Sequence, residues 1–263
     1  MEEIKLRLRH VCHYYESVDG SRVQALNHVD LDIKDGEFVA IVGASGCGKT
    51  TMLNIMSGIL KPSEGEVILE GKPLAERKHR IGYISQSETL LPWRKVIDNI
   101  VLGPELDGVP KAERYQKARK LIKAGRLSGF EDKYPFELSG GMCKRVMILR
   151  ALAHDPEIIF MDEPFGPLDV FTREALQSEI LELWAQKHLT IVYISHDIGE
   201  AISLADRIIV MGQRPSSVQK EFLVPLSRPR NVVEVRYKPE FMELEREIGR
   251  MIRKTGRGEN ADD

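Results

Sequence analysis

Residues 43–50 have the composition and spacing of a loop that binds phosphate groups. They read Gly-Ala-Ser-Gly-Cys-Gly-Lys-Thr and match the pattern G-x-x-x-x-G-K-[ST]. Glycines let successive backbone N–H groups turn toward one anion, while Lys49 neutralises the outer phosphates and the Thr50 hydroxyl can bind Mg²⁺. An apolar run at 38–42 precedes the loop and an amphipathic segment at 51–57 follows it, as this pattern requires. The segment predicts a site for a nucleoside triphosphate.

Two adjacent carboxylates, Asp162 and Glu163, follow another apolar run at 158–161. The carboxyl ends of parallel strands face the ligand crevice of an α/β sheet. We therefore expect Asp162 to hold the Mg²⁺ shell and Glu163 to polarise the water that attacks the γ-phosphate. Alone, the pair equally fits a strand that runs into a solvated loop, and the phosphate loop upstream favours the functional interpretation.

Residues 138–142 carry a third pattern, Leu-Ser-Gly-Gly-Met. Ser139 can cap a helix that begins at Gly140, and the exposed N–H groups of Gly140 and Gly141 then form a second anion site with the helix dipole. By itself, Ser-Gly-Gly equally fits an ordinary turn that caps a helix.

Composition narrows the class of protein. The 263 residues have a formal net charge of −2, with 42% hydrophobic and 30% charged residues, which indicates a globular chain with a sizeable core. The near-neutral charge argues against bulk binding of nucleic acid, and we expect neither a membrane span nor an export signal. Three widely spaced cysteines, Cys12, Cys47 and Cys143, indicate neither a disulfide framework nor a zinc site, as is typical of a reducing cytoplasm.

The remaining patterns predict an α/β fold. Unbroken aliphatic runs alternate with helical periodicity and are typical of parallel strands buried on both faces. Before residue 38 and at 65–71, apolar and polar residues alternate, which predicts a smaller antiparallel sheet. Residues 109–153 read as helices inserted into the core, and 239–253 as an amphipathic helix. The predicted parallel strands lie at 38–42, 158–161, 190–194 and 208–211.

The three motifs, together with Gln86 and His196, resemble the nucleotide-binding subunit of ABC transporters, whose signature is LSGG followed by x-x-Q-R. The resemblance extends to about residue 252. It implies a P-loop NTPase core with a mainly parallel sheet, an N-terminal antiparallel subdomain and a helical insertion at about 87–157. It also implies a single domain over 1–253, which leaves 254–263 as a disordered tail.

The resemblance further implies how such a subunit works. ATP and Mg²⁺ are its cofactors, and two copies form a head-to-tail homodimer in which the Ser139 segment of one closes over the ATP held by Lys49 of the other. The dimer then drives integral membrane permease subunits from the cytoplasmic face of the membrane. A periplasmic solute-binding protein is an indirect partner, and no nucleic acid is expected.

Individual roles carry over by position. Gln86 resembles the glutamine that reaches Mg²⁺ and the attacking water, and His196 the histidine that contacts the γ-phosphate and orients Glu163. Tyr15 resembles the aromatic residue that stacks on adenine, although a surface or core role remains open and Tyr14 is adjacent. Asp169 and the three residues before it resemble the loop that crosses the dimer interface. Asp169 also fits the role of a helix cap. The implied ATP-binding residues are Tyr15, Gly43, Ala44, Ser45, Gly46, Cys47, Gly48, Lys49, Thr50, Thr51, Ser139, Gly140, Gly141 and Asp169, and the implied Mg²⁺ ligands are Thr50, Gln86 and Asp162.

Two residues depart from the family pattern. Lys144 stands where glutamine is usual, so that a contact to the nucleotide ribose is lost or replaced by a charge, and Pro167 stands where alanine is usual. Two segments, 90–100 and 224–230, are similar to segments of the ATP-binding subunits of bacterial importers for nitrate, taurine and aliphatic sulfonates. Importers for riboflavin or pyrimidine precursors have near relatives of the same subunit.

Several alternatives remain open. Trp93 fits either a docking contact with the permease or a core residue. The basic segment 111–126 fits a solvated helix face, or less well a surface for anionic lipid or RNA. At the level of function, the alternatives are a soluble ABC ATPase that acts on nucleic acid or ribosomes, and a GTPase-like switch. The chain has little room for a second nucleotide-binding domain and lacks an N-K-x-D segment.

Overall fold

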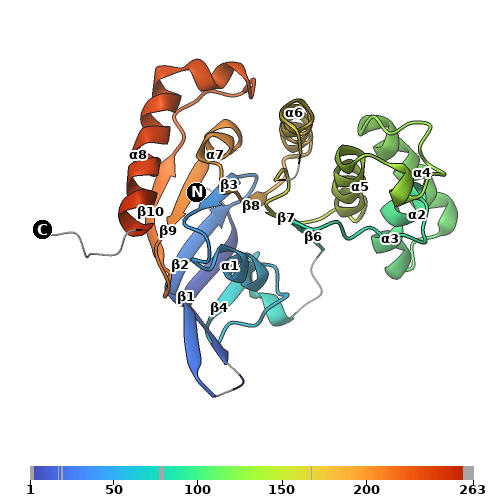
Figure 1. Ribbon diagram of the computed structural model, residues 1–263. Coiled ribbons are helices and arrows are strands. Elements are labelled where there is room, and N and C mark those ends of the chain that lie inside the picture. Colours follow the sequence, from blue (N-terminus) through green and yellow to red (C-terminus); the bar gives the residue numbers. More distant parts are fainter. Residues whose placement is uncertain (1–2, 17, 19, 77–79, 167, 257–263) are drawn as a thin grey trace, which may run out of the picture. The chain divides into compact units, whose positions relative to one another are not determined.

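The structure is a computed structural model that describes residues 3–16, 18, 20–76, 80–166 and 168–256 (Figure 1). The chain divides into two compact units. The first unit contains Met1–Lys78 and Trp184–Asp263, and the second unit contains His79–Leu183.

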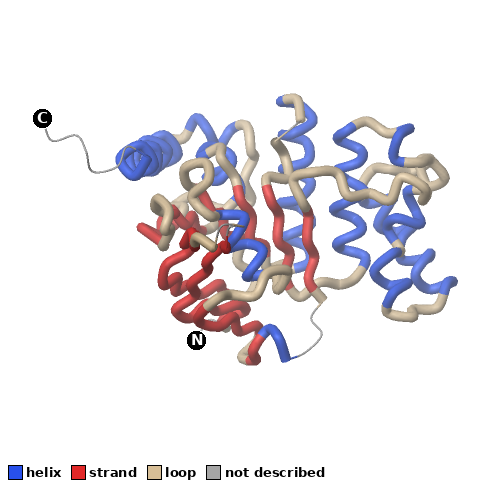
Figure 2. Tube along the Cα trace, turned by 60° about the horizontal axis from the view of Figure 1, so that its bottom comes forward, coloured by secondary structure: helices blue, strands red, loops and turns tan. Residues whose placement is uncertain are grey.

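An antiparallel sheet forms one part of the first unit. Alternation places Leu8 opposite Leu31 and Val67 in the buried row. On the other face, Arg7 Nε donates to Asp32 Oδ1 at 2.9 Å. Figure 2 shows these strands in red, side by side. Their order is β2 (Arg22–Lys34), β1 (Ile4–Glu16), β4 (Glu64–Leu69) and β5 (Lys72–Pro73).

Parallel strands form the other part of the first unit. β3 pairs in parallel with both β8 and β9, and every residue of these three strands is buried, as their unbroken apolar runs predict. β10 pairs antiparallel with β9. The aliphatic runs did not reveal β10, because this edge strand exposes most of its residues. The order is β10 (Val218–Leu223), β9 (Arg207–Met211), β3 (Phe38–Val42) and β8 (Ile191–Ile194).

Helices accompany these strands in the first unit. α7 packs on β3, and α8 packs on α7 through a stripe that includes the buried Phe241, Leu244 and Ile248 (Figure 1). α8 also includes residues 254–256, so the disordered tail predicted from residue 254 is wrong for these three; Thr255 Oγ1 donates to Met251 O and continues the helical turn. The helices are α1 (Lys49–Met56), η1 (Leu74–Glu76), α7 (Ile198–Leu204), η3 (Glu234–Tyr237) and α8 (Pro239–Gly256).

The second unit combines two parallel strands with helices. β6 (Ile81–Ile84) pairs with β7 (Ile158–Asp162), and the chain between them is helical, as the predicted insertion requires. α4 buries Ala118 and Ile122, in agreement with a solvated face for its basic residues. The helices are α2 (Val96–Ile100), α3 (Leu102–Leu106), α4 (Lys111–Ala124), η2 (Pro135–Glu137), α5 (Gly140–Ala153) and α6 (Val170–Lys187), whose last turn belongs to the first unit.

Candidate nucleotide site

The phosphate loop joins β3 to α1 in the first unit, as its sequence predicts. Gly46 and Gly48 have φ angles of 73° and 104°, which L side chains rarely adopt. A Cβ atom at Gly48 would lie 3.2 Å from the Ala25 carbonyl oxygen, whereas one at Gly46 would meet no atom within 4 Å. Glycine is therefore needed at Gly48 for close packing, while the loop is open at Gly46.

Lys49 lies at the start of α1 with its ammonium turned back onto the loop. The side chain is only 8% exposed, and Nζ donates to the carbonyl oxygens of Gly43 and Ala44 at 3.0 and 2.9 Å. Thr50 is exposed, and Thr51 is buried. An open, glycine-rich turn with a charged lysine held across its beginning fits the phosphates of a nucleotide.

Cys47 packs inside this loop. Its side chain is only 3% exposed, and its Sγ would lie 3.0 Å from a Cβ atom at Gly43. Burial raises the pKa of the thiol, although the positive charge of Lys49 opposes that shift. The thiol therefore supports the loop as a small apolar group.

Tyr15 lies beside α1. Its hydroxyl is 3.1 Å from Thr51 Oγ1, its ring packs edge-on against His13, and its side chain is 41% exposed. The adjacent Tyr14 instead accepts a hydrogen bond from Gln24 Nε2 at 3.3 Å, because successive side chains of a strand point to opposite faces. Tyr15 is thus the tyrosine of the pair that contacts the helix following the phosphate loop, with ring surface left exposed.

Asp162 and Glu163 lie at the carboxyl end of β7 in the second unit. Asp162 is buried. The burial of the Tyr83 hydroxyl, together with the negative charge of Asp162, raises the pKa of Tyr83 to about 12. Glu163 has a φ angle of 45°, a left-handed conformation that is unfavourable for a residue with a Cβ atom. Gln86, from the loop after β6, donates Nε2 to Glu163 Oε2 at 2.9 Å. The structure thus joins two of the predicted catalytic residues by a direct hydrogen bond.

Ser139 and its glycines begin α5. Ser139 Oγ accepts from the Met142 N–H at 3.3 Å, so that the predicted cap is present. A Cβ atom at Gly141 would lie 2.5 Å from Thr172 Cγ2, whereas one at Gly140 would meet nothing within 4 Å. Gly141 therefore allows close approach of α5 to the first turn of α6.

Asp169 caps α6. Its carboxylate accepts from the Thr172 N–H at 3.0 Å. Hydrogen bonds from the Thr172 side chain and then from its backbone lower the pKa of Asp169. The predicted capping role is therefore present, while the interface role stays a prediction. Pro167 lies outside the described residues.

Lys144 differs most from expectation. Its side chain is only 5% exposed, and Nζ donates to the carbonyl oxygens of Ser85 and Gln86 at 3.1 and 2.7 Å. The sequence left two outcomes open at this position, loss of a ribose contact or its replacement by a charge, and the hydrogen bonds of Lys144 to its own unit favour the first. A sequence signal for burial was present, because Lys144 shares a helical stripe with the buried Ile148 and Ala151, at i+4 and i+7.

His196 follows β8 in the first unit, where its side chain is exposed. The next residue, Asp197, caps α7 by accepting from the Glu200 N–H at 3.0 Å. The Asp197 N–H in turn donates to Ser195 Oγ at 3.0 Å. Hydrogen bonds of both neighbours therefore hold the backbone around His196.

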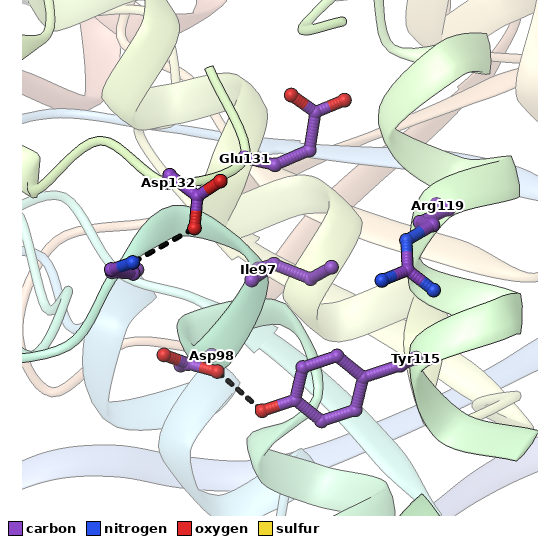
Figure 3. Close-up of a pocket in the computed structure, with 7 residues that line it drawn as sticks. Ile97, Asp98, Tyr115, Arg119, Glu131 and Asp132 are labelled. Atoms are coloured by element: carbon purple, nitrogen blue, oxygen red, sulfur yellow. Dashed lines mark hydrogen bonds and ion pairs between the residues drawn. The ribbon is translucent and has the colours of Figure 1, made fainter. Parts of the chain in front are cut away.

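A cavity of about 430 Å³ lies among the helices of the second unit (Figure 3). Two contacts lie in its wall: the Tyr115 hydroxyl donates to Asp98, and Lys95 Nζ lies 2.8 Å from Asp132. None of the predicted nucleotide-site residues lines it. Nearby in sequence, Trp93 is 71% exposed, so the core interpretation of Trp93 is wrong and docking stays a prediction.

Two further observations concern metals and membranes. Among the described residues, no three His, Cys, Asp or Glu side chains cluster so as to hold a metal ion. Across the same part of the chain, we find no helix with the length and apolar character needed to cross a bilayer.

Comparison with known proteins agrees with these features. A family model described as ABC transporter matches residues 26–166. A taurine import ATP-binding protein of Roseobacter denitrificans is 41% identical over 250 residues, which is 94% of this chain and 93% of the relative. An aliphatic sulfonates import ATP-binding protein of Bacillus thuringiensis subsp. konkukian is 40% identical over 226 residues, which is 85% of this chain and 88% of the relative.

A solved structure is similar as well. It is a dimeric, post-hydrolysis state of an ATP-binding cassette bound to ADP and Pi. The match has 32% identity and a TM-score of 0.73, and covers 84% of this chain and all of that one, at 100%. The predicted α/β architecture, with an antiparallel sheet and a mostly parallel one, is confirmed.

Proposed function

The chain belongs to the ABC transporter family, and on that premise we propose that it is the ATP-hydrolysing subunit of an importer for a small sulfonated solute. It is an ABC-type ATPase. The observation that carries the proposal is the phosphate loop, with Lys49 held across it, in a chain that is 41% identical to a taurine import ATP-binding protein. The alternative of a soluble ABC ATPase acting on nucleic acid or ribosomes is not favoured.

Hydrolysis needs a base that activates water beside the γ-phosphate. Glu163 is the candidate, because its left-handed backbone conformation is unfavourable and such strain concentrates at functional sites. The Gln86 amide donates to this carboxylate at 2.9 Å and so limits its orientation. We assign His196 to the γ-phosphate, and Tyr15 to adenine through its exposed ring.

The donor set also fits Mg²⁺. A hydroxyl from Thr50, an amide from Gln86 and a carboxylate from Asp162 are oxygen ligands of the kind that Mg²⁺ prefers. Mg²⁺ usually binds through one or two carboxylates plus substrate phosphates, so a single protein carboxylate is sufficient. When bound, Mg²⁺ would neutralise charge on the phosphates.

The partners follow from the same assignment. We propose a homodimer in which Ser139, Gly140, Gly141 and Asp169 of one subunit complete the ATP site of the other, as suggested by the dimeric state of the similar cassette. The dimer would bind integral membrane permease subunits at the cytoplasmic face, and would act on a periplasmic solute-binding protein indirectly. Trp93 is the proposed docking contact because its side chain is 71% exposed.

Isolation from membranes tests the transport assignment. The tagged chain is extracted with mild detergent from its own cells, and its partners are identified by mass spectrometry. We expect a protein with several membrane spans, with about two ATPase copies per transporter. Recovery of only soluble or nucleic-acid partners would contradict the importer function while leaving the ATPase assignment intact. The solute-binding protein found with the permease can then be tested for binding of taurine, aliphatic sulfonates and nitrate.

A further inference from the structure

The loop that carries Gln86 has no regular secondary structure of its own. Residues 85–90 follow β6 outside any helix or strand, and the Gln86 side chain is exposed. Such a loop is mobile unless other groups hold its backbone. The hydrogen bond from Gln86 Nε2 to Glu163 Oε2 therefore depends on contacts elsewhere in the loop.

Two cations of α5 supply these contacts. Lys144 Nζ donates to the carbonyl oxygens of Ser85 and Gln86, at 3.1 and 2.7 Å. Six residues further along α5, Arg150 donates to the carbonyl oxygen and the hydroxyl of Thr89, at 2.8 and 2.7 Å. The same helix thus holds both ends of the short segment 85–89.

The two bonds from Lys144 have a particular geometry. The Ser85 carbonyl belongs to the peptide plane before the Gln86 Cα, and the Gln86 carbonyl belongs to the plane after it. When both peptide planes are held, the hydrogen bond from Gln86 to Glu163 can break only by rotation about the side-chain torsions of Gln86 or by movement of Glu163. Since Lys144 is only 5% exposed, little water reaches the ammonium to compete for these bonds.

The electrostatics of this contact are consistent with its geometry. Burial lowers the pKa of Lys144, and the negative charge of Glu88, within the same loop, opposes this shift. A buried ammonium requires hydrogen-bond acceptors, which here are the two carbonyl groups of the loop. The next residue, Arg145, makes a bidentate pair with Glu179 of α6, with both distances 3.0 Å, and so holds α5 on another side.

We propose that Lys144 is a positioning residue for ATP hydrolysis: by holding both peptide planes around Gln86, it sets the contact between the Gln86 amide and the Glu163 carboxylate. The proposal rests on the proposed ATPase function. It gives a role to a lysine at a position where the family pattern expects glutamine. It also connects the helix that begins at Ser139 to the candidate base within one unit.

Substitution of Lys144 by methionine tests the proposal. Methionine has a similar reach and no donor, and an apolar side chain suits a buried site, so we expect the variant to fold. Because small displacements of a positioned group reduce rates by up to about 100-fold, kcat should fall between about 10- and 100-fold. KM for ATP should change less than about 2-fold, since ground-state binding is not removed. Hydrogen exchange of the amides at 85–89 should become faster.

A double-mutant cycle with Gln86→Ala separates positioning from a general structural effect. If Lys144 acts through Gln86, Lys144→Met should reduce kcat no further in the Gln86→Ala background. Lys144→Leu, which also removes the donor, provides the same comparison should the methionine variant fail to fold. Lys120→Met, an exposed lysine on α4, is the matched control and should hydrolyse ATP at the parental rate.

Either of two results would overturn the proposal. One is a parental kcat for Lys144→Met, and the other is an equal loss of kcat with and without the Gln86 side chain. Failure of the proposed function gives a different result. In that case the unsubstituted chain would not hydrolyse ATP, or Glu163→Gln would leave its hydrolysis unchanged.

Discussion

Single residues in this chain show how far side-chain chemistry depends on its surroundings. Lys49 and Lys144 are both buried lysines that donate to two backbone carbonyl groups. Lys49 lies on the phosphate loop, where we propose that phosphate oxygens replace the carbonyl partners, whereas Lys144 keeps its carbonyl partners in the loop after β6. Cys47 belongs to the phosphate loop as well, but burial raises its pKa and makes it a packing group. The local environment of a side chain, more than its residue type, thus decides whether it can bind a ligand or stabilises the fold.

Glu163 is the residue whose change should affect chemistry most directly. Glu163→Gln keeps the shape of the side chain and an oxygen that can accept from Gln86, but removes the base. We expect ATP binding to remain and hydrolysis to slow by roughly 10²- to 10⁴-fold, or about 3 to 5 kcal/mol of barrier. Steady-state phosphate release measures the rate, and equilibrium binding of a fluorescent ATP analogue measures affinity.

The matched control is Glu182→Gln, which alters an exposed carboxylate on α6. This variant should keep the parental rate. Hydrolysis by Glu163→Gln at the parental rate would remove Glu163 from the mechanism.

Elements position these residues through close contacts as well as hydrogen bonds. α5 and α6 approach at Gly141 and Thr172, directly after the caps formed by Ser139 and Asp169. The Ser-Gly-Gly pattern thus has a packing role in addition to its proposed role at the nucleotide. Its two glycines differ, because only Gly141 faces another side chain at short range.

Alanine substitutions of the two glycines should separate these roles. At Gly141 the new Cβ would lie 2.5 Å from Thr172 Cγ2, so a shift is unavoidable. Overpacking of this kind typically lowers the free energy of unfolding by about 1 to 3 kcal/mol. Urea denaturation followed by circular dichroism measures the effect.

Gly140→Ala is the control, because its Cβ meets nothing within 4 Å. Thr172→Ser removes the methyl group and should restore much of the stability that Gly141→Ala loses. Equal stability of the two alanine variants would show that α5 and α6 are not in close contact at this point.

At the scale of the whole molecule, the proposed dimer would convert the binding energy of ATP into movement of one subunit relative to the other. Both proposed anion sites begin helices, with α1 following the phosphate loop and α5 following Ser139. The similar cassette is dimeric in a state bound to ADP and Pi. A second copy is therefore the proposed source of the Ser139 segment for each ATP.

Assembly can be measured with the slow-hydrolysis variant. Glu163→Gln with Mg²⁺ and ATP should sediment at twice the monomer mass, because bound ATP is no longer lost by turnover. With ADP, or with EDTA in place of Mg²⁺, the same variant should sediment as a monomer. Glu163→Gln combined with Lys49→Ala serves as the control that cannot hold the phosphates. A monomer at saturating ATP would contradict the nucleotide-bridged dimer.

The sequence by itself determined the fold class, the family and the position of each predicted motif. This was possible because phosphate binding needs particular residues at short, fixed spacing, and buried parallel strands need unbroken apolar runs. The edge strand β10 was missed since it exposes most of its residues and carries no such run. The end of α8 was also misplaced, by three residues.

Tertiary structure decided contacts between residues far apart in the chain. Only the structure shows that Tyr15, and not Tyr14, contacts Thr51 of α1. It also shows that Gly141 lies against Thr172, and that Lys144 donates to the carbonyl groups of Ser85 and Gln86. Lys144 lies 58 positions from Gln86, and no local pattern encodes which carbonyl groups a buried ammonium will meet. Only the packing of α5 beside the loop after β6 brings these groups within hydrogen-bond distance.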